Sequence, residues 1–330
     1  MLNADAQLSE KLFSPDVEMS PTRDGFGKGV VEAGKHDPRV VVLCADLAES
    51  TRAEWFQKEF PERFIEMGVA EQNMATVASG MASAGKIPFI ASYAVFSPGR
   101  NYEQIRTTIA LNNVPVKICG MHAGVSVGPD GATHQMLEDI GMMRALPGMT
   151  VIAPGDAEEA RKAVIASVTT DGPVYLRFGR APTPCFTTSE SPFHIGKALM
   201  LWGSDSPKIT FLSTGSISYT VLSVARALAE DGIESVVLHV PTIKPLDAEA
   251  VLNVARRAGR VITVEEHQVA GGFGSAIAEC LVEHHPVPMR LIGIQDQFGQ
   301  SGSPEELLTH YGLDSTSIEN VARKFLTHEI

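Results

Sequence analysis

The stretch Gly128-Pro129-Asp130-Gly131-Ala132-Thr133-His134-Gln135 is a polar loop between two regular segments. Residues 116–120 before it are mostly apolar and predict a strand, and the amphipathic residues 136–145 after it predict a helix. Its glycines permit positive φ and close approach of a ligand, and its proline fixes one φ. Because open parallel sheets bind ligands at the loops that follow their strands, the stretch predicts an α/β fold with part of a functional site here.

Strand-like and helix-like segments alternate on both sides of this loop. The alternation predicts two consecutive doubly wound α/β domains with mainly parallel sheets. The N-cap residues Asp156, Asp247, Ser303 and Thr316 mark the starts of four helices. The other expected segments are strands at residues 40–43, 87–91, 150–152, 174–178, 209–212, 236–240 and 261–264, and helices at residues 71–84, 101–111 and 219–229.

The domain boundaries follow from a change in composition. Three prolines among serines and threonines interrupt the alternation around residues 181–196, as is typical of an interdomain linker. We therefore divide the chain into a lead-in (1–18), a first domain (19–182), a linker (183–196) and a second domain (197–330).

Composition excludes several classes of protein. The 330 residues suffice for two domains with full cores. A net charge of −12 argues against nucleic acid or an anionic membrane as the main partner, but an anionic small substrate needs only a local basic pocket. No apolar run approaches the roughly 20 residues that span a bilayer, and the four cysteines form no CxxC motif. We expect reduced thiols in a cytoplasmic protein.

Glu71 begins a helix that otherwise consists mostly of small and apolar residues. The ordinary interpretation is a first-turn acid that the helix dipole favours. The alternative is a buried, unpaired carboxylate, which is costly and therefore often functional. Residue type alone leaves both open.

Two aromatic residues and two histidines follow predicted strands. Tyr93 and Phe96 are ordinary core residues by type, but on one strand-end loop they could also form a slot for a flat heterocycle. His122, Asp130 and His134 lie within thirteen residues of one another. They suit general acid/base work or recognition of hydroxyl groups. A zinc site is disfavoured because no HxH or HExxH motif is present.

Several arginines could hold a phosphate or carboxylate, although exposed arginines are usually only solvated. Arg177 and Arg180 end a predicted strand, Arg23 precedes a glycine-rich helix start, and Ser50 with Arg52 follows the first strand.

Two glycine-rich patterns of cofactor binding are missing or incomplete. Residues 271–274 (Gly-Gly-Phe-Gly) lack the full GxGxxG spacing, so close packing of a helix on a sheet explains them better. The sequence contains no P-loop and no Gly-Asp-Gly followed by paired asparagines, the arrangement that holds a metal and a diphosphate in thiamine enzymes.

Together these segments resemble the C-terminal half of transketolase. The resemblance runs from about Met19 to the end of the chain and rests on residues 45–47, 68–72, 93 and 96, 130–135, 176–177, 265–267 and 271–274. Transketolases have three α/β domains: the first binds the diphosphate and metal of thiamine diphosphate, the second holds its pyrimidine, and the third is C-terminal. This chain is similar to the second and third, and to the small subunit of split transketolases.

The resemblance implies roles for residues at the cofactor. Glu71 matches the catalytic glutamate that hydrogen-bonds the pyrimidine ring nitrogen of thiamine diphosphate. Tyr93 and Phe96 match the aromatic pocket around that ring, and Asp46 and Leu47 match further cofactor-binding positions.

The resemblance also implies roles at the substrate. His134 matches a catalytic histidine at the reacting carbon, and Asp130 matches the aspartate that reads a substrate hydroxyl. The positions that bind a sugar phosphate are matched by four residues, namely His122, Arg177, Ser50 and Arg23.

The implied reaction is transfer of a two-carbon ketol unit between a ketose and an aldose, with sugar phosphates of the pentose phosphate pathway as the default substrates. No metal ligand is expected in this chain. Mg²⁺ or Ca²⁺ and the diphosphate are expected on an N-terminal partner subunit, in an α2β2 assembly with shared sites.

Three alternatives stay open. The β subunit of a 2-oxo-acid dehydrogenase E1 component has the same pair of domains, but usually lacks a run like residues 130–135. A deoxyxylulose-phosphate-synthase-like carboligase has a similar loop, but normally carries all its domains in one chain. A non-catalytic interaction or regulatory subunit is the alternative from another class, and the intact Glu71, Asp130 and His134 argue against it.

Overall fold

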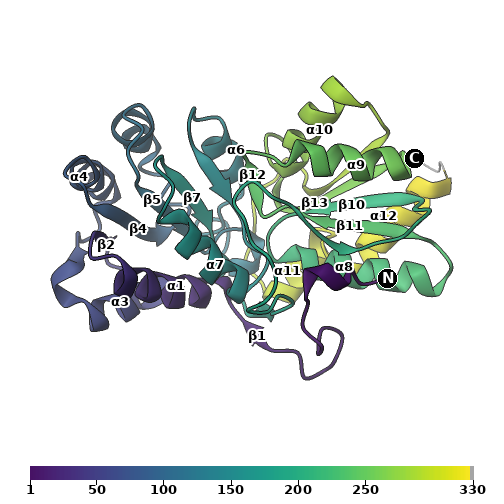
Figure 1. The fold of residues 1–330 in the computed structure, drawn as a ribbon, viewed down its shortest axis with the longest axis horizontal. Helices are drawn as coiled ribbons and strands as arrows, with labels where there is room; N and C mark the ends of the chain where they lie inside the picture. Colours follow the sequence, from purple (N-terminus) through teal and green to yellow (C-terminus); the bar gives the residue numbers. More distant parts are fainter. Residues whose placement is uncertain (328–330) are drawn as a thin grey trace.

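A seven-stranded sheet forms the first half of the molecule, as the computed structural model of residues 1–327 shows (Figure 1). Each neighbouring pair of strands is parallel except the first pair in the following order. In spatial order the strands are β12 (Thr242–Lys244), β6 (Thr150–Ile152), β7 (Val174–Arg177), β5 (Lys117–Met121), β4 (Ile87–Tyr93), β2 (Val40–Cys44) and β3 (Phe64–Glu66).

A five-stranded sheet forms the second half, and it too is parallel except at one edge. Both halves therefore confirm the predicted α/β class with two mainly parallel, doubly wound domains. In spatial order its strands are β14 (Met289–Ile294), β13 (Val261–Gln268), β10 (Ile209–Ser213), β11 (Ser235–His239) and the antiparallel β9 (Leu199–Trp202).

Helices cover both faces of each sheet, so the central strands are buried on both sides and consist of continuous apolar runs. On the first sheet α1 (Thr22–His36), α3 (Ala53–Glu59) and α7 (Ala157–Ser167) pack on one face, and α4 (Glu71–Ser83), the π-helical turn η3 (Ile105–Ala110) and α6 (Asp139–Arg144) on the other. On the second sheet α8 (Ile217–Glu230) and α12 (Ser315–Thr327) oppose α9 (Ala248–Ala258) and α10 (Phe273–His284).

Short elements complete the chain: α2 (Ala48–Thr51), α5 (Tyr102–Gln104), α11 (Pro304–His310), and the 3₁₀ turns η1 (Ala4–Ala6), η2 (Pro61–Arg63) and η4 (Val125–Val127). None of the helices within residues 1–327 is both long and apolar enough to cross a membrane.

Three predicted helices differ in detail. The helix expected at residues 101–111 is the short α5 followed by the π-helical η3. The helix expected from residue 136 begins only at Asp139, because Met136 still pairs with Ala123 in a parallel bridge. The cap predicted at Thr316 is wrong: Asp314 accepts a hydrogen bond from Ser317 N (3.1 Å) instead. The caps at Asp156, Asp247 and Ser303 are confirmed.

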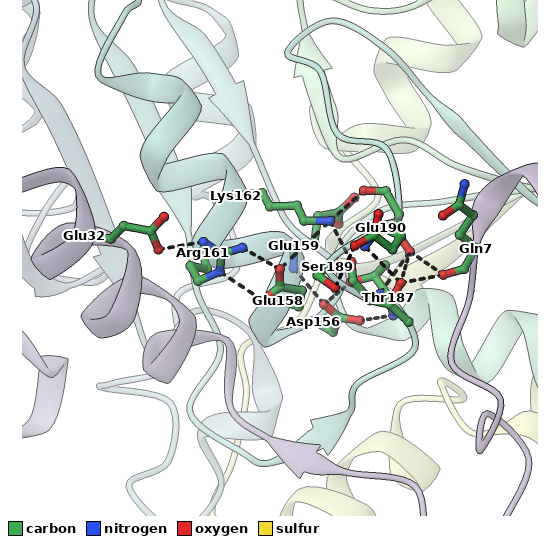
Figure 2. A network of polar contacts seen from close by, with 12 residues as sticks. Gln7, Glu32, Asp156, Glu158, Glu159, Arg161, Lys162, Thr187, Ser189 and Glu190 are labelled. Atoms are coloured by element: carbon green, nitrogen blue, oxygen red, sulfur yellow. Dashed lines mark hydrogen bonds and ion pairs between the residues drawn. The ribbon is translucent and has the colours of Figure 1, made fainter. Parts of the chain in front are cut away.

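Residues 183–196, which the composition predicts to be a linker, are packed against both domains. Their first residues form β8 (Thr183–Pro184), which pairs with β1 (Met19–Ser20). Phe186 is fully buried, and Thr187 donates from its N (2.6 Å) and Oγ1 (2.7 Å) to Asp156. Lys162 Nζ donates to the carbonyl groups of Thr188 and Ser191 (both 2.6 Å). Figure 2 shows this network, which fixes the segment as a structured connection.

The lead-in, residues 1–18, lies along the second domain although it precedes the first. Leu2 forms an antiparallel bridge with Trp202 beside β9, and Asn3 N donates to Leu201 O (3.0 Å). Tyr219 of α8 donates from its hydroxyl to Leu12 O (2.9 Å). The lead-in therefore packs against the second domain, although in sequence it comes directly before the first.

Buried polar contacts join the two domains. His239 of β11 lies 2.7 Å from Glu159 of α7 and 2.7 Å from the hydroxyl of Ser218, and all three are buried. His267 of β13 accepts from Gly141 N through Nε2 (3.4 Å), and its Nδ1 lies 2.7 Å from Gln268 O. These distances make His267 a neutral imidazole with the proton on Nδ1.

The buried His267 predicts a specific dependence of stability on pH. Burial lowers the pKa of His267 from 6.5 to about 4, so between these values the unfolded chain binds a proton that the folded chain does not. Stability is therefore lost as the pH falls through this window. Between pH 7 and pH 5, the free energy of unfolding of His267→Gln should fall by about 2 kcal/mol less than that of the wild type. Urea unfolding at the two pH values measures the difference.

The control is the same substitution at His284, whose side chain is 47% exposed. His284→Gln should follow the wild-type pH profile. A His267→Gln profile that parallels the wild type would contradict the interpretation.

Candidate functional site

Four of the residues singled out in the sequence meet at the carboxyl edge of the first sheet. Tyr93 at the end of β4 lies with its hydroxyl 2.6 Å from Ser50 Oγ, and its ring centroid 4.0 Å from that of His122 after β5. Arg23, at the start of α1, donates to Ser50 O (2.8 Å), and its Nη1 lies 3.0 Å from His122 Nε2. The edge is where parallel sheets bind ligands.

His122 is fully buried and adopts a positive φ of 54°. Burial and the charges of Arg23, Arg180 and Arg52 lower its pKa to about 3, so the ring is neutral near pH 7. Because Nε2 accepts from Arg23, the proton is on Nδ1, which is buried and has no partner among the described residues. A strained residue that carries an unpaired buried donor indicates a ligand position.

Arg180 belongs to the same group of positive charges. Its Nη1 donates to Val127 O (2.8 Å) and lies 3.7 Å from Asp130 Oδ1. Arg52 is neutralised by Asp24 at 2.7 Å, whereas Nε of Arg23 is buried without a partner in residues 1–327. A chain of net charge −12 thus concentrates positive charge here, which favours an anion.

Arg177, expected from the sequence to bind phosphate, lies apart from this group. It is only 9% exposed, and it donates from Nε to Asp139 Oδ2 (2.8 Å) and from Nη2 to Glu266 O (2.9 Å). Its guanidinium group is already used by a buried ion pair, so the assignment to substrate is corrected. Arg180, three residues further along and beyond the end of β7, faces the site instead.

An aromatic wall continues the site. The rings of Tyr93 and Phe96 are nearly parallel (11°), with centroids 6.0 Å apart. His134 stands edge-on to both rings at 6.1 and 5.7 Å, and its Nδ1 lies 2.9 Å from Thr133 Oγ1. Asp130, on the same loop as His134, is on the surface beside Arg180.

Glu71 lies at the first position of α4 and is 2% exposed. The sequence leaves open an unpaired carboxylate; in the structure Oε2 accepts from Arg100 Nη1 at 2.6 Å. Arg100 is 45% exposed and lies over the Phe96 ring at 4.7 Å, so it connects the carboxylate to the aromatic wall. Sequence reasoning does not single out Arg100, and only its closeness to Phe96 in the chain hints at a role.

Asp46 and Leu47, predicted to contact a cofactor, lie at the end of β2. They line a hollow of about 380 Å³ together with Arg23 and Ser50, and Asp46 has a positive φ of 57°. The hollow therefore groups these two residues with the positively charged side of the site.

The described residues, 1–327, contain no cluster of three or more His, Cys, Asp or Glu side chains that could hold a metal ion. The glycine-rich start of α10 is not open to a phosphate either, since Glu265 accepts from the backbone N–H groups of Phe273 (2.6 Å) and Gly274 (2.7 Å). A Cβ atom on Gly272 would lie 2.2 Å from Glu265 Oε2, which supports close packing as the reason for these glycines.

Comparisons with known proteins agree with this arrangement. The family model of the transketolase pyrimidine binding domain matches residues 18–184, and that of the transketolase C-terminal domain matches residues 196–318. A Methanocaldococcus jannaschii protein described as a putative transketolase C-terminal section is 43% identical, over 90% of this chain and 93% of its own.

This chain also aligns with two further relatives over nearly the whole of their length. The 6-deoxy-6-sulfo-D-fructose transketolase subunit of a Clostridium species is 38% identical over 94% of this chain and 96% of its own. A solved structure described as a split gene transketolase, inactive beta4 tetramer, superposes with a TM-score of 0.86 at 41% identity, covering 93% of this chain and 98% of that one. The chain belongs to the transketolase family, and it has the two domains of the C-terminal subunit of a split transketolase.

Proposed function

We propose that this chain transfers a two-carbon ketol unit between an anionic ketose and an aldose, as one subunit of a thiamine diphosphate-dependent enzyme. The observation that carries the proposal is the grouping at one sheet edge of a buried carboxylate, an aromatic wall, a histidine and a positive cluster. These are Glu71, Tyr93 with Phe96, His134, and Arg23 with His122 and Arg180.

The residues present fit the pyrimidine end of the cofactor. A flat ring can stack on Phe96, and a ring nitrogen can hydrogen-bond Glu71 if the half-exposed Arg100 moves aside. Bound thiamine diphosphate supplies the electron sink for the carbon–carbon chemistry. Glu71 would hold the ring and exchange a proton with it at its carboxylate. Asp46 and Leu47, which the resemblance assigns to the cofactor, would contact it from the hollow that they share with Arg23 and Ser50.

The substrate contacts are assigned from the charges of the side chains and from their positions beside the aromatic wall. His134 stands edge-on to the aromatic wall, where it can exchange a proton with a substrate hydroxyl. Asp130, beside it on the loop, reads the configuration of a neighbouring hydroxyl. The anionic end of the sugar is bound by Arg23, Arg180, the Nδ1–H of His122 and Ser50. A relative named for a sulfonated sugar supports an anionic substrate, as phosphate or sulfonate.

An N-terminal subunit completes each site in an α2β2 assembly. It holds the diphosphate and its Mg²⁺ or Ca²⁺, for which residues 1–327 of this chain offer no cluster of three or more His, Cys, Asp or Glu side chains. The solved relative, described as an inactive beta4 tetramer, supports the view that C-terminal subunits need this partner.

The first test is reconstitution. Purified chain with thiamine diphosphate and Mg²⁺ should show no ketol transfer, and addition of the N-terminal subunit of a split transketolase should restore it. Transfer is measured with xylulose 5-phosphate or a sulfonated ketose as donor and a labelled aldose as acceptor. Activity of the chain alone would refute the division of labour, and the absence of activity with the partner would refute the function.

The second test removes the carboxylate. Glu71→Gln keeps the size of the side chain but removes its charge, so it should lower kcat of the reconstituted enzyme by at least about 100-fold. Binding of the partner should persist, as measured by analytical ultracentrifugation. Glu62→Gln, on the surface turn η2, is the matched control and should retain full activity. Near-normal turnover of Glu71→Gln would contradict the cofactor role.

The third test separates the two arginines. Arg180→Ala should raise KM for phosphorylated sugars about 10- to 100-fold, the loss expected for one charge-assisted hydrogen bond, and leave KM for unphosphorylated analogues unchanged. Arg177→Ala should lower the unfolding temperature, because it leaves Asp139 unpaired in the core. The opposite pattern would return the substrate contact to Arg177.

A further inference from the structure

Two loops from different domains meet behind the substrate side of the site. We call residues 122–135 the site loop, and residues 295–303, between β14 and α11, the support loop. Gln135 of the site loop is 4% exposed. Its Nε2 donates to the carbonyl groups of Val125 (3.2 Å) and Gly128 (3.1 Å) within the site loop, and of Gln300 (2.9 Å) in the support loop. One amide therefore ties the turn before Asp130 to the second domain.

The two loops touch so closely that glycine is required on both sides. A Cβ atom on Gly131, whose φ is +74°, would lie 2.7 Å from Ser301 Oγ. A Cβ atom on Gly299 would lie 1.7 Å from Oε1 and 2.8 Å from Cδ of Gln135. Gln135 cannot move away from such an atom without losing its hydrogen bonds, so the contact is intolerant of change.

The support loop is the fixed side of this contact. Its end is held by the capping box of Ser303 with Glu306, and its middle by Tyr311, whose hydroxyl donates to Phe298 O (3.0 Å). Gln268 Nε2 donates to Gln297 O (2.7 Å), which anchors its start to β13. Around Asp130 the site loop has its own turns, such as Gly131 N to Gly128 O (3.1 Å) and His134 N to Gly131 O (3.0 Å), and the half-exposed Arg180, which donates to Val127 O (2.8 Å).

We propose that Gln135 is a positioning residue through which the second domain sets the placement of Asp130 and His134. The inference rests on the proposed function, which gives those two residues their substrate contacts. The three groups facing Gln135 Nε2 are all carbonyl oxygens, so this position requires a hydrogen-bond donor, and the two N–H groups of the amide are shared among them. Gln135 Oε1 is buried without a partner in residues 1–327, so the side chain is held through its nitrogen alone.

Two variants disturb this contact in different ways. Gln135→Glu keeps the shape of the side chain but turns an oxygen toward the carbonyl groups. Gly299→Ala leaves the Gln135 side chain chemically unchanged, but its added methyl group pushes that side chain out of position. In the reconstituted enzyme each should lower kcat/KM for the ketose about 100-fold, the effect of a displacement of about 1 Å at a reacting group. Discrimination between ketoses that differ at the hydroxyl read by Asp130 should fall too, while the Kd of thiamine diphosphate stays unchanged.

The control is Gly203→Ala, the same substitution in the same domain. There a Cβ atom would lie 3.5 Å from Met200 Sδ, an ordinary van der Waals contact, so kcat/KM should stay at the wild-type value. The double variant Gln135→Ala/Gly299→Ala tests the coupling. Gln135→Ala removes the two atoms that the added methyl group would approach most closely and leaves only Cβ, 3.3 Å away. Gly299→Ala should therefore cost little in that background.

Hydrogen–deuterium exchange on the chain alone gives a readout independent of activity. Peptides covering residues 125–135 should exchange faster in Gln135→Glu and Gly299→Ala than in the wild type or Gly203→Ala. Wild-type exchange and wild-type kcat/KM in Gly299→Ala would overturn the positioning role. If the wild-type complex shows no ketol transfer, the proposed function fails, and the exchange result still decides whether the second domain holds the site loop.

Discussion

The buried ion pair between Arg177 and Asp139 is the constraint on which the site depends. Arg177 ends β7, Asp139 begins α6, and the pair is completed by the hydroxyl of Tyr175 (2.6 Å) and the carbonyl of Glu266 in the second domain. A charge in the interior must keep its partners, since removing one costs about 3–5 kcal/mol. The pair therefore holds β7, α6 and β13 in one arrangement. The site loop lies next to these elements, so its position depends on them.

Glu266 connects the ion pair to the site loop, because its carbonyl group accepts from Arg177 and its carboxylate accepts from the loop. Its Oε1 accepts from Ser126 N at 2.6 Å, and a Cβ atom on Gly124 would lie 2.3 Å from it. Burial raises the pKa of Glu266, which is the cost of placing a carboxyl group there. The same domain interface thus fixes the loop at its beginning through Glu266 and at its end through Gln135. Between these points the loop is free to present Asp130 and His134.

The parts of the site that the sequence predicts are those encoded locally. Tyr93 follows a buried strand and Glu71 starts a helix, so the strand and helix patterns alone bring them to one edge of the sheet. Arg177 is the last residue of β7 and Arg180 lies three residues beyond it, and only the geometry of the strand end separates their roles. The contact of Gln135 with the second domain spans 165 residues, and β12 from the second half of the chain completes the first sheet beside β6. No local pattern indicates such distant pairings, and composition likewise predicts a linker at residues 183–196, where β8 pairs with β1 and Phe186 is buried.

The pairing of Glu71 with Arg100 bears on how such a subunit can exist apart from a partner. A carboxylate that is 2% exposed is costly unless it is compensated, and Arg100 compensates it from a side chain that is 45% exposed. Arg100 keeps its contact with Phe96 and half of its surface in water, so its displacement loses little hydration. In the proposed function, a ring nitrogen at Glu71 would compete with a partly solvated ion pair rather than with a fully buried one, which would lower the cost of admitting the ring.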